Sequence, residues 1–313
     1  MSSSVLTITR RDIRDSLQDW RTFLPLTVLA VFLPLILRVG IRIMVGFLDD
    51  ADLTSAVVPL GLLIAGFLPA SFSLIGPLES FVGERERNTL ESLLSAPVSD
   101  RGLYLGKLAA SLTPPLMSSA IAMTMYTLAT YAGRPVRSFS QVFVLADFLT
   151  PAWIAVIVLM IVIKTVMMVT AAVYLSSRTT SIRAANLLAS FILIPMTFVV
   201  QVEALLLINK VPFWIIPINL ALLALAIFFV IWGLRSFNRE ELLGREHKMV
   251  RDRAGTMPRI SSRNEGAVLT VAQREIRDTL TDWRILIPIM LLSVLVPLGV
   301  LAGTIIAYNK GLN

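Results

Sequence analysis

The sequence contains no cysteine and only one histidine, His247. The absence of thiols excludes disulfide bonds, thiolate metal sites and cysteine nucleophiles. A single histidine excludes metal sites built from several imidazoles. Because His247 falls in a charged stretch between apolar segments, it also gives no support to a Ser/His/Asp catalytic triad.

Charge is scarce as well. Charged residues make up 16% of the chain, whereas soluble domains carry about 25%. Hydrophobic residues make up 56%, and the mean hydropathy is +0.77. This composition predicts an all-α polytopic membrane protein. The net charge of +7 is typical of an orientation signal in such a protein, and we expect no nucleic-acid partner. The first twenty residues are charged throughout, so we expect no cleavable signal peptide.

Seven apolar segments are long enough to cross a bilayer, which takes about 20 residues. They span roughly 23–46, 56–80, 108–132, 152–176, 186–208, 213–235 and 285–307. Arginine and lysine concentrate before residue 23 and in the alternate loops 81–107, 177–185 and 236–267, whereas the loop after the first segment reads LDDADL. The positive-inside rule therefore predicts a multi-pass protein of the cell membrane. Its N-terminus would be cytosolic, and residue 313 would lie on the opposite side.

Residues 5–21, VLTITRRDIRDSLQDWR, have the pattern of an amphipathic helix. Ile13, Leu17 and Trp20 recur at three- and four-residue spacing, and charged residues fill the other side. We predict that residues 1–22 lie in the membrane interface with Trp20 at headgroup depth. An ordinary cytosolic helix next to the membrane is the alternative.

The same stretch returns near the end of the chain. Residues from Val5 match residues from Val268 in register, and the matches include charged positions and the pair Trp20/Trp283. We therefore predict an interfacial helix (1–22), a six-helix unit (23–235), a basic cytosolic linker (236–267) and the start of a second copy (268–313). The second copy would have one spanning helix, with Trp283 as its interfacial anchor. The chain would be a truncated copy or the first part of a longer tandem protein.

Residues 83–99, GERERNTLESLLSAPVS, form a charged segment between the second and third apolar runs. Residues 84–95 suit a short helix with Leu90, Leu93 and Leu94 on one face. Pro97 would end it. Ser99 would then cap the next helix, which carries Lys107. A charged helix with a leucine face, held between two spans, suits contact with a soluble partner.

This segment resembles the signature of ABC-2 type exporter permeases, most closely the sodium-extrusion subgroup. The resemblance rests on the order of residues from Glu84 to Lys107, and it departs from the family pattern at Asn88, where glycine is usual. It implies a six-helix unit like that of type V exporters, with a coupling helix at about 83–97 that docks on a cytosolic ATP-binding subunit. It also implies a second permease half, from a homodimer or a tandem half. The implied coupling residues are Glu84, Arg85, Glu86, Arg87, Asn88, Thr89, Glu91, Leu93, Leu94, Pro97 and Lys107.

The sequence contains no phosphate-binding loop of the GxxxxGK[ST] type. We therefore expect no cofactor and no metal on this chain, with ATP and magnesium bound by the partner. Glu240, Glu241 and Arg245 resemble the EExxxR motif of intramembrane CAAX-type proteases, but that chemistry also needs several histidines. The interpretation is a transporter rather than an enzyme. A secondary transporter without an ATPase is the alternative, followed by an intramembrane enzyme. Sodium, lipid, peptide and drug all remain open as substrates.

Ionisable residues inside spans are costly and point to function. The candidates for a substrate path or for intramembrane pairs are Arg38, Arg42, Lys164 and Glu203. Snorkelling to the interface is the alternative for Arg42 and Glu203, and also for Glu79. The second copy has Leu301 and Ile305 in place of Arg38 and Arg42. These arginines are therefore not part of the repeated framework, which favours a local role for them.

Overall fold

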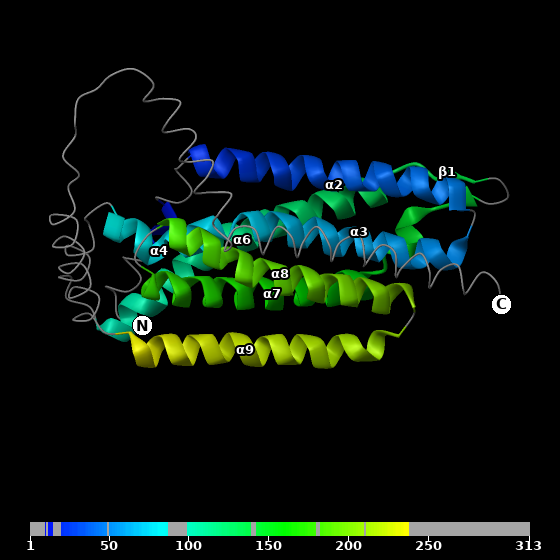
Figure 1. Ribbon diagram of the computed structural model, residues 1–313. Helices are drawn as coiled ribbons and strands as arrows, with labels where there is room; N and C mark the ends of the chain where they lie inside the picture. The colour runs from blue at the N-terminus through cyan, green and yellow to red at the C-terminus, as the bar shows by residue number, and fades with distance from the viewer. Residues whose placement is uncertain are drawn as a thin grey trace, which may run out of the picture. The chain divides into compact units, whose positions relative to one another are not determined.

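The helices of this chain run side by side as a bundle (Figure 1). The computed structural model describes residues 10, 12–14, 20–48, 50–86, 99–138, 142–179, 182–209 and 211–237. The expected linker (236–267), second copy (268–313) and Trp283 lie outside the described residues, except for Ser236 and Phe237. So does most of the expected interfacial helix.

Six helical segments among the described residues are long and apolar enough to cross a membrane. The fold class is therefore the expected all-α polytopic one. The helices are α2 (Trp20–Leu48), α3 (Ala51–Phe72), α4 (Ile75–Glu86), α6 (Asp100–Tyr131), α7 (Pro151–Arg178), α8 (Ile182–Ile208) and α9 (Ile215–Ser236).

The second span is not the single helix expected over 56–80. It is divided into α3 and α4, which meet at Ser73 and Leu74. The break lies just before Gly76 and Pro77. Proline lacks the backbone N–H that would continue the helix, and its ring clashes with the carbonyl four residues earlier. Ser73 ends α3 by donating its backbone N–H to the Pro69 carbonyl at 3.0 Å.

Helix starts follow local side-chain chemistry. The Ser99 Oγ accepts the backbone N–H of Gly102 at 3.2 Å at the start of α6, which confirms Ser99 as the expected cap. Thr150 Oγ1 accepts the N–H of Trp153 at 3.4 Å at the start of α7. Pro151 then occupies the first helical position, where its missing N–H is harmless.

A short hairpin that the sequence analysis did not predict connects α6 to α7. Its antiparallel strands are β1 (Val136–Arg137) and β2 (Val142–Phe143), and the 3-10 turn η1 (Leu145–Phe148) follows. The Tyr131 hydroxyl donates to the Leu149 carbonyl at 2.6 Å. The Ser138 hydroxyl donates to the Gly46 carbonyl at 3.2 Å. We call this end of the bundle the hairpin end, and the end where α4 stops and α6 begins the signature end (Figure 1).

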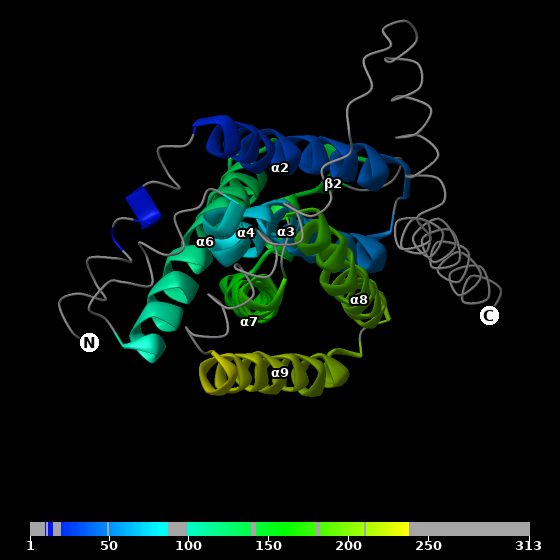
Figure 2. The same cartoon turned by 60° about the vertical axis from the view of Figure 1, so that its left-hand side comes forward.

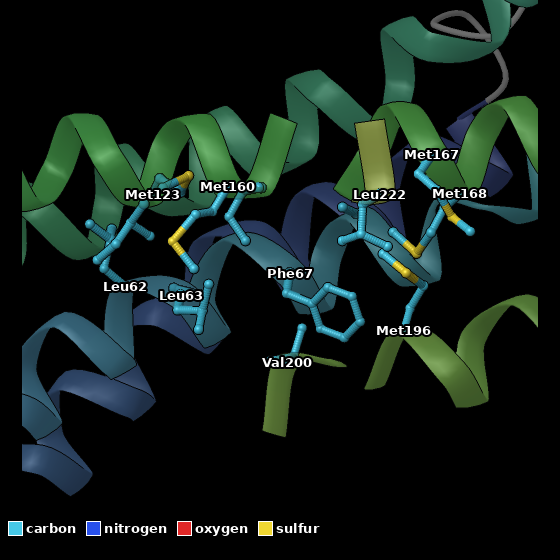
Figure 3. Close-up of a cluster of buried hydrophobic side chains, with 14 of the residues drawn as sticks. Leu62, Leu63, Phe67, Met123, Met160, Met167, Met168, Met196, Val200 and Leu222 are labelled. Atoms are coloured by element: carbon cyan, nitrogen blue, oxygen red, sulfur yellow. The ribbon is translucent and has the colours of Figure 1, made fainter. Parts of the chain in front are cut away.

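The centre of the bundle is built by α3 and α7. In the most apolar part of the span Ala51–Glu84, which contains α3, 67% of residues are buried, and in that of α7 56% are buried. The corresponding values are 28% for α2 and 22% for α9. Helix α7 packs against α3, α4, α6, α8 and α9, and Figure 2 shows α9 as an outlying helix. Methionine and leucine side chains from several helices meet between them, among them Leu63, Met160 and Met196 (Figure 3). Unbranched methionine fills the irregular gaps between helices.

Candidate functional site

An ion cluster lies at the signature end. The Lys107 Nζ on α6 is 3.0 Å from Glu84 Oε1 at the end of α4, and 3.0 Å from Asp12 Oδ2 in the N-terminal segment. Lys107 is only 5% exposed. One buried ammonium thus joins the start of the signature segment, residues 83–99, and the helix that follows it, α6, to the N-terminal region. Glu84 and Lys107 were expected at this segment, whereas the role of Asp12 was not foreseen.

The last turns of α4 are fixed to their neighbours. The Ser176 Oγ on α7 accepts the backbone N–H groups of Phe81 at 3.1 Å and Val82 at 3.3 Å. The Phe81 ring stacks on Tyr104 of α6, and Phe237 beyond α9 contacts both rings. Polar and aromatic contacts therefore tie the end of α4, where the signature segment begins, to α6, to α7 and to the residue after α9.

Gly233 allows α9 to approach this aromatic group closely. A methyl group at position 233 would overlap the hydroxyl and the ring carbon of Tyr104 that bears it. Both atoms are rigidly placed, since the Tyr104 ring is fully buried. Glycine is therefore required here for space between α6 and α9.

The rest of the signature segment is only partly described. Arg85 and Glu86 belong to α4 by backbone, and Trp20 begins α2. The remaining expected coupling residues lie outside the described residues: Arg87, Asn88, Thr89, Glu91, Leu93, Leu94 and Pro97.

A second charged group lies inside the bundle and joins α7, α8 and α9. The Lys164 Nζ is 2.7 Å from Glu203 Oε2, and both side chains are 0% exposed. Lys164 also donates to Asn219 Oδ1 at 3.3 Å, and the Asn219 amide donates to Glu203 Oε1 at 2.8 Å. Glu203 is thus buried and paired rather than snorkelling to the interface. We call these three residues the Lys164 cluster.

Asn219 is the member that the sequence analysis missed. It is a single amide in an otherwise apolar segment, so charge patterns do not reveal it. The available signal was its type, since a lone asparagine in a span usually has a hydrogen-bond partner. Here it satisfies the remaining oxygen of Glu203 and also donates to the Ile215 carbonyl at 2.9 Å.

Arg38 on α2 is buried against the end of α6. Its Nε donates to the Ala129 carbonyl at 2.9 Å. Ala129 is in the last turn of α6, where carbonyls have no partner within the helix and a positive charge is favourable. Arg42, one turn along α2, is exposed, and Glu79 on α4 is half-buried. The structure thus brings Lys164 and Glu203 together and leaves Arg38 and Arg42 apart from them.

A cavity of about 350 Å³ lies at the hairpin end, among η1 and the ends of α3, α7 and α8. Its walls mix apolar side chains with one carboxylate and two hydroxyls: Ser55, Ala56, Asp147, Phe148, Thr150, Trp153, Leu206 and Leu207. None of the expected site residues lines it.

A comparison with protein-family models supports the bundle of membrane helices. A family model described as ABC-2 family transporter protein matches residues 6–213. This range is more than half of the chain and contains the signature segment together with Lys164 and Glu203, whereas Asn219 lies beyond it. No curated protein matches the chain. With six apolar helices and this match, the chain is a multi-pass membrane protein that belongs to the ABC-2 family of transporter proteins.

Proposed function

We propose that this chain is the membrane-spanning permease subunit of an ATP-driven exporter. It would move its substrate across the cell membrane with energy from a separate ATP-binding subunit. The family match supports a transport permease. The sequence has no phosphate-binding loop of its own, so ATP and magnesium would bind to the partner. A second permease half, as a homodimer or a tandem half, would complete the path.

The observation that carries this proposal is the position of the ion cluster at the signature end. Glu84 lies at the start of the segment that we propose as the coupling helix, Lys107 lies beyond its end, and the Lys107 Nζ is 3.0 Å from Glu84 Oε1. A docked subunit that moved residues 83–99 would therefore pull on α4 and α6 together. Ser176 would pass the same displacement to α7, at the centre of the bundle. Rigid contacts of this kind suit the transfer of a movement from a soluble subunit to a membrane bundle.

Co-purification with the ATP-binding subunit encoded beside this chain tests the proposal. Leu94→Asp would place a charge on the leucine face that we propose docks, and we expect it to reduce capture of the subunit at least tenfold. Val142→Asp is the matched control, because Val142 is 61% exposed at the hairpin end. Unchanged capture by Leu94→Asp would contradict the docking site.

A secondary transporter is the second candidate function. Buried ionisable residues in spans are a feature of proton and ion relays, and the Lys164 cluster is such a group. Transport by membrane vesicles separates the two mechanisms. An exporter needs ATP and is inhibited by vanadate, whereas a secondary transporter follows an ion gradient and is insensitive to vanadate.

The orientation of the bundle is part of the proposal. We place the signature end and the N-terminus in the cytosol, which the distribution of arginine and lysine supports. The chain has no native cysteine, so single cysteines can be added one at a time. Val142→Cys should react with an impermeant maleimide in intact cells, whereas Ser3→Cys should not. The reverse labelling pattern would show that the N-terminus lies outside the cell, contrary to the proposed orientation.

A further inference from the structure

The guanidinium of Arg38 is buried without enough partners. A guanidinium carries five N–H donors, and the structure records one hydrogen bond, from Nε to the Ala129 carbonyl. Arg38 is only 8% exposed, and its buried Nη2 atom has no hydrogen-bond partner among the described residues. Gly133 leaves room for this nitrogen, since a methyl group at position 133 would overlap it. A buried unsatisfied donor is costly and calls for an acceptor.

This site has no ion pair within the part of the chain that the structure describes. Neither Arg38 nor Arg42 forms an ion pair with a described carboxylate. Arg42 lies four residues further along α2 and therefore on the same helix face. Two unpaired positive charges, one buried and one exposed, thus stand one turn apart.

Both arginines lie within the membrane part of α2. The span covers Leu24–Phe47. At 1.5 Å per residue, Arg38 is about 14 Å and Arg42 about 8 Å from its hairpin-end limit. At its depth the Arg42 side chain can reach the headgroup region, and the Arg38 guanidinium lies against Gly133, just beyond the end of α6. The neighbouring exposed side chains of α2, Ile36, Val39 and Ile43, are apolar and suit acyl chains.

The repeated stretch of sequence does not have arginine at these two positions. The matching residues of the repeated stretch of sequence are Leu301 and Ile305. An apolar pair would cost less in a bilayer, so two arginines with no ion-pair partner among the described residues favour an external anion.

We propose that Arg38 and Arg42 form a binding site for a phosphate group, held in the leaflet at the hairpin end. Arginine suits this ligand because its planar fork can bind two phosphate oxygens at once. The ligand would be the phosphodiester of a phospholipid headgroup, with its acyl chains along the apolar face of α2. A soluble phosphate offers the same chemistry without the chains.

Lipid binding to the purified full chain in a neutral detergent tests the site. Native mass spectrometry would compare phosphatidylglycerol with galactosyl diacylglycerol, which has matched tails and no phosphate. A third arm would titrate inorganic phosphate at constant ionic strength. We expect retention of phosphatidylglycerol at least tenfold above the glycolipid. Equal retention of the two lipids would overturn the proposal. Binding of inorganic phosphate as tight as that of the phospholipid would support the phosphate site and assign it to a soluble ligand.

Arg42→Gln is the decisive variant, because Arg42 is exposed and its loss should leave the fold intact. We expect it to weaken phosphatidylglycerol binding about tenfold. Arg235→Gln is the matched control, since Arg235 is an exposed arginine in the last turn of α9. Gly133→Ala keeps both charges but displaces the Arg38 guanidinium, and it should also weaken binding. If Arg42→Gln and Arg235→Gln bind the lipid equally, the proposal is wrong.

Discussion

Lys164 and Arg38 are both basic residues buried in spans, but their surroundings differ. Lys164 meets a carboxylate at 2.7 Å and an amide oxygen at 3.3 Å, and the amide in turn satisfies the carboxylate. Arg38 has one carbonyl partner, a second arginine one turn away and an unsatisfied nitrogen. In the first group even Glu203 Oε2, which has no hydrogen-bond partner, is held by its ion pair with Lys164, whereas Arg38 Nη2 has neither kind of partner among the described residues.

This difference distinguishes intramembrane charges that stabilise the fold from those that can bind a ligand. A closed group such as the Lys164 cluster joins three helices and leaves no group for a ligand. An open group such as Arg38 and Arg42 keeps unused donors and positive charge. Charge inside a span is therefore not sufficient evidence for a substrate path, because the degree of satisfaction decides between the two roles.

Lys164→Met should cause the largest loss of stability. It leaves the Glu203 carboxylate buried without its cation, which costs about 3–5 kcal/mol. Thermal unfolding in detergent would measure the loss. The double variant Lys164→Met with Glu203→Met should recover most of it, because two apolar side chains of similar volume replace the pair. If the double variant were as unstable as the single one, the loss of stability would not come from the unpaired Glu203 carboxylate, and this explanation would be wrong.

Lys107→Met should have a smaller effect on stability. Its partners Asp12 and Glu84 are 20% and 28% exposed by side chain, so water can solvate them after the change. We expect a loss of about 2 kcal/mol in the same unfolding measurement. A loss as large as that for Lys164→Met would show that partner burial does not control the cost.

Arg38→Met should cost only about 1 kcal/mol in detergent without added lipid. The Ala129 carbonyl loses its donor, but no opposite charge is left unpaired. Addition of phosphatidylglycerol should increase the difference in unfolding free energy between this variant and the native chain, since only the native chain binds the lipid. A loss comparable to that of Lys164→Met would place Arg38 in a closed structural group.

Arg42→Gln should change stability by less than about 0.5 kcal/mol, as expected for an exposed side chain with no recorded partner. The same unfolding curves would measure this. A clear destabilisation in pure detergent would show that Arg42 has a structural partner, and it would weaken the case for an open site.

The sequence predicted the helices well because long apolar runs are a strong signal. It failed at the second span, where hydropathy continues through the break and only Gly76 and Pro77 mark it. It also failed at the hairpin. Strands of two residues, Val136–Arg137 and Val142–Phe143, are too short to show a pattern of alternating side chains.

The functional groups were only half predictable. Residue type and position identified Lys164, Glu203 and Arg38 as unusual, but their partners come from other helices. Pairing across 55 residues, as between Lys164 and Asn219, depends on how helices pack and leaves no trace in local spacing. In the same way, Asp12 reaches Lys107 only through the fold.

Hydrogen exchange on the permease with its ATP-binding subunit tests the central claim most directly. Amide exchange would be followed along the chain with and without the subunit, in the native protein and in Leu94→Asp. The account predicts slower exchange across residues 83–99 when the native complex forms, and no change in the variant. Protection that falls elsewhere, for example only in the linker 236–267, with residues 83–99 unaffected, would contradict it.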